Sequence, residues 1–414
     1  MRKIAILTFI FIILASLIVT AKAQQSSPGR VDDRYSRIIV TTRVVEALGK
    51  IGDPKTRDVL IEALKSKEFF IRAYAAEALG RLQNKESIPL LKPLIRDKNY
   101  LVSVLAAVAL TDLGDKDAEE VLFAFLKHEN PAVRAIAVEK AGRFGDNFLA
   151  AFIEMLPKEK EESVRVKLIE QLGANKYKPA LPLIRKALKD ESAQVRIAAC
   201  TAIAKLEDKE SIPRLIERLK DQDVLVRAAA TGALATFEER TQIGLFRKEM
   251  EEEDSILKTS SYVALANLGE LDILPVLLKK IVAPESPTII RTEAARALMI
   301  LKPHIFNLVE EALGEAEVLY EVPLLQSLQF DYQVNGRNLK LILTEALKDS
   351  ENPLHQDAPL ILYRLDAKMA LPALRSALSE GNPEFVALTA YVLGEFWDKE
   401  ATEYLIEVFE KYGI

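Results

Sequence analysis

The chain has 414 residues, of which 49% are hydrophobic, 28% charged and 7% aromatic, and its formal net charge is -5. This acidic balance, with both signs interspersed, disfavours a nucleic-acid binder, which needs a basic surface for the phosphates. The single cysteine, Cys200, excludes an intramolecular disulfide.

The first residues have the pattern of a secretory signal peptide. Arg2 and Lys3 precede an uncharged run, Ile4 to Thr20, and Ala21-Lys22-Ala23 supplies small residues for cleavage after Ala23. We therefore predict a signal peptide over residues 1–23, a short polar lead over residues 24–34, and export to the bacterial periplasm or envelope. No stable membrane insertion is expected after cleavage. An uncleaved N-terminal anchor is the alternative, because the apolar run is slightly long for a signal.

From residue 35 to residue 414 the sequence repeats with a period of about 31 residues. A residue that is often arginine, in the pattern Val-Arg-x-x-Ala, marks the phase. The marker positions are Thr41, Arg72, Ser103, Arg134, Arg165, Arg196, Arg227, Lys258, Arg291, Glu321, His355 and Val386. The residue seven after each marker is apolar, and leucine-like residues recur 19 and 23 after it. These spacings predict about twelve pairs of amphipathic helices.

The residues between the helices agree with this prediction. Short polar residues 12 after the marker, such as Asp53 and Asp115, are predicted to cap the second helix. Glycines eight after the marker are predicted to end the first helix. They are Gly80, Gly142, Gly173 and Gly394. The pattern is regular to about residue 290 and irregular over about 291–355.

Helix pairs of this length bury their apolar faces by stacking on their neighbours. The stretches "VRAIAVEKAGRFGD" and "VRIAACTAIAKLEDKESIPRLIERLKD" resemble the HEAT-like repeats of the phycobilin (PBS) lyase type. The resemblance implies an all-α, right-handed superhelical solenoid over residues 35–414. It also implies a scaffold or regulator of partner proteins. The alternative is an accessory subunit of an enzyme, or a protein that handles a chromophore or cofactor as bilin lyases do.

The repeated arginine has two interpretations. A functional one makes it a cationic ladder for phosphates or for an acidic partner. A structural one has each guanidinium bond a loop carboxylate and neighbouring carbonyls, joining each unit to the next. Recurrence in unit after unit favours the structural ladder. Its members are Arg72, Arg134, Arg165, Arg196 and Arg227.

The sequence offers no constellation for catalysis. His128 and Glu129 form one His-Glu pair, whereas the HEAT-like enzyme deoxyhypusine hydroxylase holds two irons with several such pairs. His304 and His355 are isolated, and Cys200 occupies a core position of its helix. We predict a non-enzymatic protein with no catalytic residue, metal or cofactor, and with protein rather than nucleic-acid partners.

Two binding surfaces are predicted. Second helices carry a mixed stripe 20 residues after the marker, which would line a concave face. Its basic members are Lys92, Arg185, Arg247 and Arg375. The other surface is the irregular segment "LQFDYQVNGRN", around a turn predicted at Asn335-Gly336. Its candidate residues are Phe330, Tyr332, Asn335 and Arg337.

Overall fold

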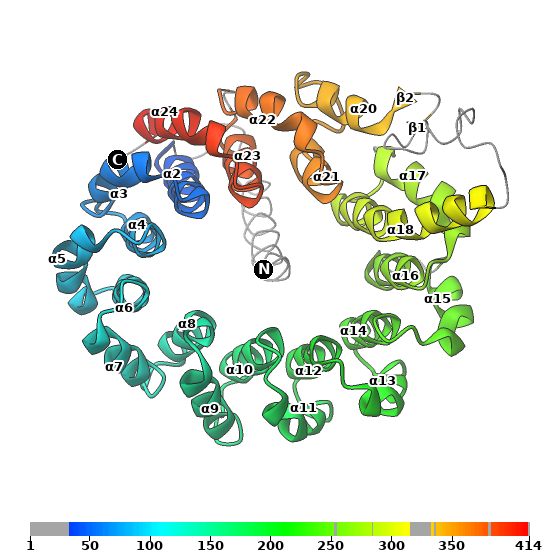
Figure 1. Ribbon diagram of the computed structural model, residues 1–414, viewed down its shortest axis with the longest axis horizontal. Coiled ribbons are helices and arrows are strands. Elements are labelled where there is room, and N and C mark those ends of the chain that lie inside the picture. Colours follow the sequence, from blue (N-terminus) through cyan, green and yellow to red (C-terminus); the bar gives the residue numbers. More distant parts are fainter. Residues whose placement is uncertain are drawn as a thin grey trace, which may run out of the picture.

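The computed structural model describes residues 33–251, 255–283, 285–314, 333–334, 337–379 and 382–412. The described chain forms a closed ring of helix pairs (Figure 1). The predicted all-α fold of stacked helix pairs is confirmed, and the predicted signal peptide lies outside the described residues. No helix within the described parts of the chain combines the length and the apolar content needed to cross a bilayer.

The first helix of each pair lines the inside of the ring (Figure 1). In chain order these inner helices are α2 (Asp33–Ile51), α4 (Phe69–Arg81), α6 (Tyr100–Asp112), α8 (Pro131–Ala141), α10 (Glu162–Ala174), α12 (Ala193–Leu206), α14 (Val224–Ala235), α16 (Ser255–Asn267), α18 (Thr288–Gly314), α21 (Ala358–Arg364) and α23 (Pro383–Glu395). Each packs directly on the inner helix that follows it.

The second helices form an outer layer (Figure 1). They are α3 (Arg57–Ala63), α5 (Ile88–Leu91) with its 3-10 extension (Lys92–Arg96), α7 (Lys116–Phe125), α9 (Asp146–Met155), α11 (Leu181–Ala187), α13 (Ile212–Arg218), α15 (Ile243–Glu249), α17 (Leu274–Val282), α20 (Leu339–Ala346), α22 (Leu371–Ala377) and α24 (Thr402–Tyr412). An apolar core runs around the ring between the two layers. Asp53, Asn84 and Asp115 accept hydrogen bonds from backbone N–H groups just after them, as predicted for caps.

The predicted role of the glycines as helix ends is wrong. Gly80, Gly173 and Gly394 lie inside their helices, and Gly142 directly follows α8 without a left-handed conformation. They are small because the next inner helix touches them: a Cβ on Gly80 would lie 2.6 Å from the Cα of Ala109. The left-handed residue that reverses the chain comes three residues later, at Gly114 and Gly145 for example.

The regular pairs are interrupted between α17 and α21. The helix α18 continues through Pro303, so His304 lies inside a long helix and not near the start of a second one. The two-residue strands β1 (Gln333–Val334) and β2 (Arg337–Asn338) pair antiparallel on either side of the predicted turn. Further on, α21 packs on both α18 and α23, which continues the inner layer.

The ring closes because the first unit packs on the last. Helix α2 lies against α23 and α24, and a Cβ on Gly394 would lie 2.9 Å from the Cα of Ala47. This is the same glycine–alanine contact that joins Gly80 to Ala109. The Nζ of Lys50 lies 2.6 Å from Oε1 of Glu395 across the seam.

Candidate interaction surface

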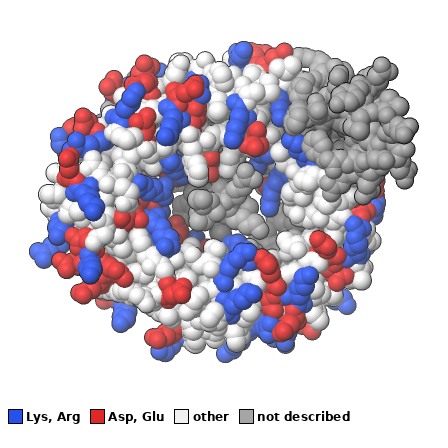
Figure 2. Space-filling view, viewed as in Figure 1, with Lys and Arg blue, Asp and Glu red and all other residues white. Residues whose placement is uncertain are grey.

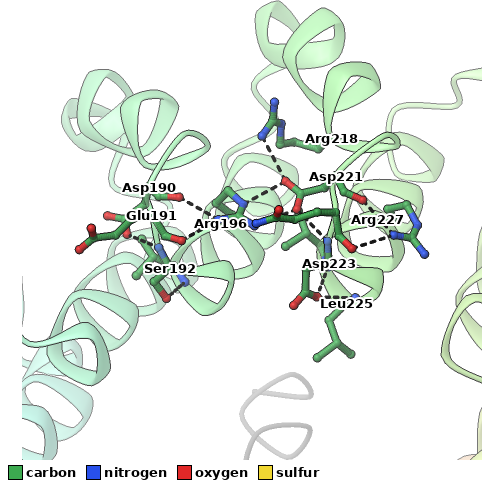
Figure 3. Close-up of polar contacts among 12 residues, drawn as sticks. Asp190, Glu191, Ser192, Arg196, Arg218, Asp221, Asp223, Leu225 and Arg227 are labelled. Carbon is green, nitrogen blue, oxygen red and sulfur yellow. Dashed lines mark hydrogen bonds and ion pairs between the residues drawn. The ribbon is translucent and has the colours of Figure 1, made fainter.

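The marker arginines connect successive units at the start of the inner helices (Figure 3). In Arg196, Nε and Nη2 donate to the carboxylate of Asp221 at 3.0 and 2.8 Å. Its Nη1 donates to the backbone carbonyls of Asp190 and Glu191 at 2.9 and 3.0 Å. The side chains of Arg196 and Asp221 are only 7% and 4% exposed. This arginine therefore has no surface left for a phosphate or an acidic partner.

The same geometry recurs along the chain. In each case the carboxylate belongs to the loop 25 residues further on. The pairs are Arg72 with Asp97, Arg134 with Glu159, and Arg165 with Asp190. Arg227 donates to the carbonyls of Asp221 and Gln222. A bidentate guanidinium suits this role because one planar group serves two loops at once.

The predicted concave stripe on the second helices is corrected by the structure. These helices lie on the outside of the ring (Figure 1). Their basic residues pair with acids of the following unit. Arg185 and Arg375 make bidentate contacts to Asp208 and Asp398. Arg247 binds Asp272 and Glu270, and Lys92 lies 3.0 Å from Asp115. Sequence periodicity defines two faces but does not say which of them is concave.

The second predicted surface is only partly described. Phe330, Tyr332 and Asn335 lie outside the described residues. Arg337 lies in β2, where its backbone pairs with Val334.

The inner helices expose a different surface, which sequence reasoning missed. Charged and tyrosine side chains two, five, six, eight or nine residues after the marker line the hollow, and we call them the luminal belt. Its members are Arg43, Glu46, Lys50, Tyr74, Glu77, Arg81, Asp112, Glu139, Lys140, Arg143, Lys167, Glu170, Lys205, Glu293, Arg296, Tyr363, Arg364, Tyr391 and Glu395. Figure 2 shows basic and acidic side chains around the central hollow.

Glu77 is the central acid of one ion-pair network in the belt, and its side chain is 5% exposed. Arg81 of the same helix and Lys140 of α8 lie 2.9 and 3.0 Å from its carboxylate. The contact with Lys140 passes over α6, which presents Val108 and small residues at this level. A contact that skips a unit requires side chains on the concave side, where neighbouring helices converge. Arg143 continues the network to Asp112.

The belt also crosses the seam. Lys50 bridges Glu46 and Glu395, and its Nζ lies 4.8 Å from the ring centroid of Tyr391, within cation–π range. The hydroxyl of Tyr363 donates to Glu395 at 3.2 Å. On the other side of the ring, Lys167 lies 3.2 Å from both Glu139 and Glu170.

The electrostatics follow from this pairing. Burial raises the pKa of Glu77, but Lys140, Arg81 and Arg143 outweigh it and lower the pKa to about 2. Burial together with the neighbouring glutamates raises the pKa values of Tyr74 and Tyr391 well above the ordinary value. The carboxylate of Glu77 is therefore charged and both tyrosines are neutral hydrogen-bonding groups at neutral pH.

The remaining candidates for chemistry are dispersed. The ring of His355 is buried and stacks on Phe385 at 4.2 Å. His128 accepts a hydrogen bond from the N–H of Asn130, and Cys200 is buried in α12. Within the described ranges no three histidine, cysteine or acidic side chains are grouped as a metal site would require. A small hollow lies on the outer side of the seam, between Thr41, Ser66 and Phe409.

Nine basic and seven acidic groups, together with three tyrosines, give the belt a mixed polar character. Pockets for small molecules are mostly apolar with a few placed polar groups, so the belt does not resemble one. It resembles a protein interface, where ion pairs and aromatic side chains fix register and orientation.

The family model for HEAT repeats matches residues 36–103, 89–165, 149–235 and 212–299. No curated protein matches the sequence significantly. Among solved structures, YibA of E. coli is 20% identical, with a TM-score of 0.31 over 66% of this chain and 90% of its own. The CpcE–CpcF complex of phycocyanin lyase from Nostoc is 19% identical, with a TM-score of 0.32 over 62% and 94%.

A third similar structure is Kap95p bound to RanGDP, which is 14% identical, with a TM-score of 0.38 over 89% of this chain and 56% of its own. The family match covers well over half of the chain and follows the same repeat phase as the inner and outer helices. The predicted HEAT-like repeats are thus confirmed, and such repeats generally serve as protein-interaction scaffolds. The chain belongs to the HEAT-repeat family.

Proposed function

We propose that this protein is an exported, non-enzymatic scaffold whose ring holds a segment of a partner protein against the luminal belt. The observation that carries the proposal is the belt itself, an arc of paired charges and tyrosines inside a closed ring. The arc runs from α18 through α21, α23 and the seam to α12, and it has no members on α14 and α16. HEAT-repeat proteins generally bind other proteins and are generally not catalysts, which supports the general class.

The belt suits an extended or looped polypeptide that carries both charge signs. Each of its ion pairs is made within the ring, so a partner can replace one member of a pair without leaving the other charge unpaired. Tyrosines add apolar contact area and hydrogen bonding at little entropic cost. Because the ring is closed, the partner segment enters from one rim as a free end or a loop.

Site-specific photo-cross-linking in the native host tests this proposal. A photoreactive phenylalanine derivative would replace Tyr74 or Tyr391 in the belt, and Tyr404 on the outer helix α24 in the matched control. We expect a defined protein cross-linked from both belt positions and not from position 404. Labelling only from the outer position would contradict the proposal. A cross-linked enzyme whose activity needs the ring would instead assign the accessory-subunit role.

A charge variant gives an independent test. Replacing Lys140 and Lys167 by alanine should weaken capture of the same partner, because both lysines join units across the belt. The control replaces Lys116 and Lys209, which are exposed at the turns. Circular dichroism must show equal helix content in both variants. Equal capture by both would exclude the belt as the site.

Export is supported by residues 1–23 of the sequence, where a basic start, an apolar run and Ala21-Lys22-Ala23 follow one another. We expect the mature protein in the periplasmic fraction with Gln24 as its first residue. Mass spectrometry of the protein purified from its host decides this. An intact N-terminus in the membrane fraction would establish the uncleaved anchor, and an intact chain in the cytoplasm would refute export.

A further inference from the structure

The two rims of the ring differ in charge, and this difference follows from the arginine ladder. Neighbouring inner helices run parallel and start at the same rim, and glycine–alanine contacts at Gly49, Gly80, Gly173 and Gly394 hold several of them in register. The loops that lead into these helices are joined side by side. Arg165, for example, donates to the carbonyl of Lys160 and to the carboxylate of Asp190. We call this edge the entry rim.

The ladder neutralises four acids of the entry rim and leaves its lysines free. Asp97, Glu159, Asp190 and Asp221 each pair with a marker arginine. The exposed cations of the same loops have no carboxylate within 4.0 Å among the described residues. They are Lys67, Arg96, Lys98, Lys127, Lys158, Lys160, Lys189 and Lys220. Four exposed glutamates share these loops, namely Glu129, Glu161, Glu162 and Glu191. Eight cations against four acids make this arc of the rim basic, although the whole chain is acidic.

Exposed aromatic side chains stand between these lysines. Phe70 and Tyr100 begin neighbouring inner helices and are 43% and 44% exposed, and the ring of Phe70 lies 4.1 Å from that of Phe69. Leu225 holds the same position as Phe70 at the start of α14 and is 37% exposed. Over the same units the turns at the opposite rim are mixed in charge and partly ion-paired, as in Lys55–Glu403 and Lys176–Glu207.

We propose that the entry rim docks on an anionic lipid surface, with its lysines at the headgroups and Phe70 and Tyr100 in the interface. Lysines beside exposed aromatic residues are the usual composition of such a contact. Seven of the eight cations are lysine, which acts as a point charge and lacks the bidentate fork that arginine uses to read phosphates in nucleic acids. The arginines of the ladder instead bond to carboxylates and carbonyls within the protein.

Binding of the mature chain, from Gln24, to vesicles tests the charge. The vesicles contain phosphatidylcholine alone or equimolar phosphatidylglycerol and phosphatidylcholine, in low and high salt. The test variant carries Lys67→Gln, Lys98→Gln and Lys127→Gln. The control carries Lys85→Gln, Lys116→Gln and Lys209→Gln at the opposite rim, where these lysines are also exposed. Each lysine near an anionic surface contributes about 1 kcal/mol, or roughly fivefold. We expect roughly 100-fold weaker binding to the anionic vesicles in low salt for the test variant, and little change for the control.

Tryptophan emission tests the orientation. The only tryptophan, Trp397, is exposed on the opposite rim and should keep its emission when vesicles are added. Tyr100→Trp should add a component that shifts to the blue and is quenched by brominated lipid. Absence of this shift in the presence of vesicles would refute rim docking. An equal loss of vesicle binding in both lysine variants would also overturn the proposal. So would a protein that is retained on immobilised DNA but not on the anionic vesicles.

Discussion

Removing the guanidinium of Arg196 is the sharpest test of the structural ladder. In Arg196→Met the carbonyls of Asp190 and Glu191 lose a charged donor, and the buried carboxylate of Asp221 loses its bidentate partner. Breaking a buried pair by removing one member costs about 3–5 kcal/mol. Arg218 and the N–H of Asp223 still donate to Asp221, at 3.2 and 3.1 Å. We therefore expect a loss near the lower end, about 3 kcal/mol.

The loss should depend on pH with a definite sign. Burial raises the pKa of Asp221, but hydrogen bonds from Arg196 and from the N–H of Asp223 outweigh it, so the pKa is lowered. A lowered pKa stabilises the fold above the ordinary aspartate pKa of about 3.9, and this contribution is lost as the pH falls. In Arg196→Met burial dominates, and the carboxylate becomes easier to protonate. The difference in stability between wild type and variant should therefore be largest near neutral pH and shrink towards pH 4.

Denaturant unfolding followed by circular dichroism gives the size of the loss, and native-state hydrogen exchange localises it. Because long repeat arrays depart from two-state behaviour, the exchange of amides in α12 and α14 is the decisive measurement. The double variant Arg196→Met, Asp221→Asn removes the unpaired buried charge and should recover part of the loss. A loss of less than about 1 kcal/mol in the free energy of unfolding, without pH dependence, would refute the structural ladder and restore the cationic interpretation.

Four further predictions follow from the geometry. A Cβ on Gly232 would meet nothing within 4 Å, so Gly232→Ala should stabilise α14 by about 1 kcal/mol. Gly173→Ala should destabilise the protein, because its Cβ would lie 2.8 Å from the Cα of Ala202. Thermal unfolding compares the two variants. Gly394→Val should separate α23 from α2, and small-angle scattering should then show a larger radius of gyration at unchanged helix content. Glu77→Gln should lower the free energy of unfolding by about 3 kcal/mol at neutral pH, since the pKa of Glu77 is about 2 against an ordinary value of about 4.3. The difference in stability between wild type and variant should vanish as the pH falls from 4 towards 2. Urea titrations at several pH values test this. Burial raises the pKa of Cys200 to about 12, so thiol reagents should label it only when α12 unfolds, and rapid labelling of the native protein would contradict its placement in the core.

The repeat phase could be predicted from the sequence because the same physical demand recurs in each unit. An apolar residue seven after the marker, such as Leu79 or Leu172, is fully buried. The partners of Arg196 also follow a fixed spacing, because neighbouring loops are 31 residues apart in every regular unit. Features that every unit must share are therefore visible in a single sequence.

The luminal belt could not be predicted in the same way, because its residues differ from unit to unit. Five residues after the marker, Val108 and Thr201 interrupt the acids of the other units, so the periodic signal is incomplete. The salt bridge from Lys140 to Glu77 passes over a whole unit and depends on the curvature of the ring. One signal was available: acids five after the marker recur at Glu46, Glu77, Glu139 and Glu170. To predict closure of the ring, one must also know how far each unit bends the stack.

That bend has a simple origin in side-chain size. Adjacent inner helices meet through glycine and alanine, as at Gly49 with Ala78, whereas the outer helices present leucine, phenylalanine and prolines near their starts. Helix separation depends on the side chains at the contact, so each unit is a wedge that is narrower on the inside. Repeated wedges turn the stack continuously in one direction.

Closure of the ring then needs no additional structural element. When the turn is complete, Ala47 of the first unit meets Gly394 of the last with the geometry of an ordinary junction between units. An open solenoid must cover the apolar faces of its terminal repeats with polar capping units. In this chain the two terminal faces cover each other, and Val40 and Val44 in the first unit and Leu405 in the last are fully buried. The bend per unit and the number of units are therefore linked, since a change in either would expose both faces at once.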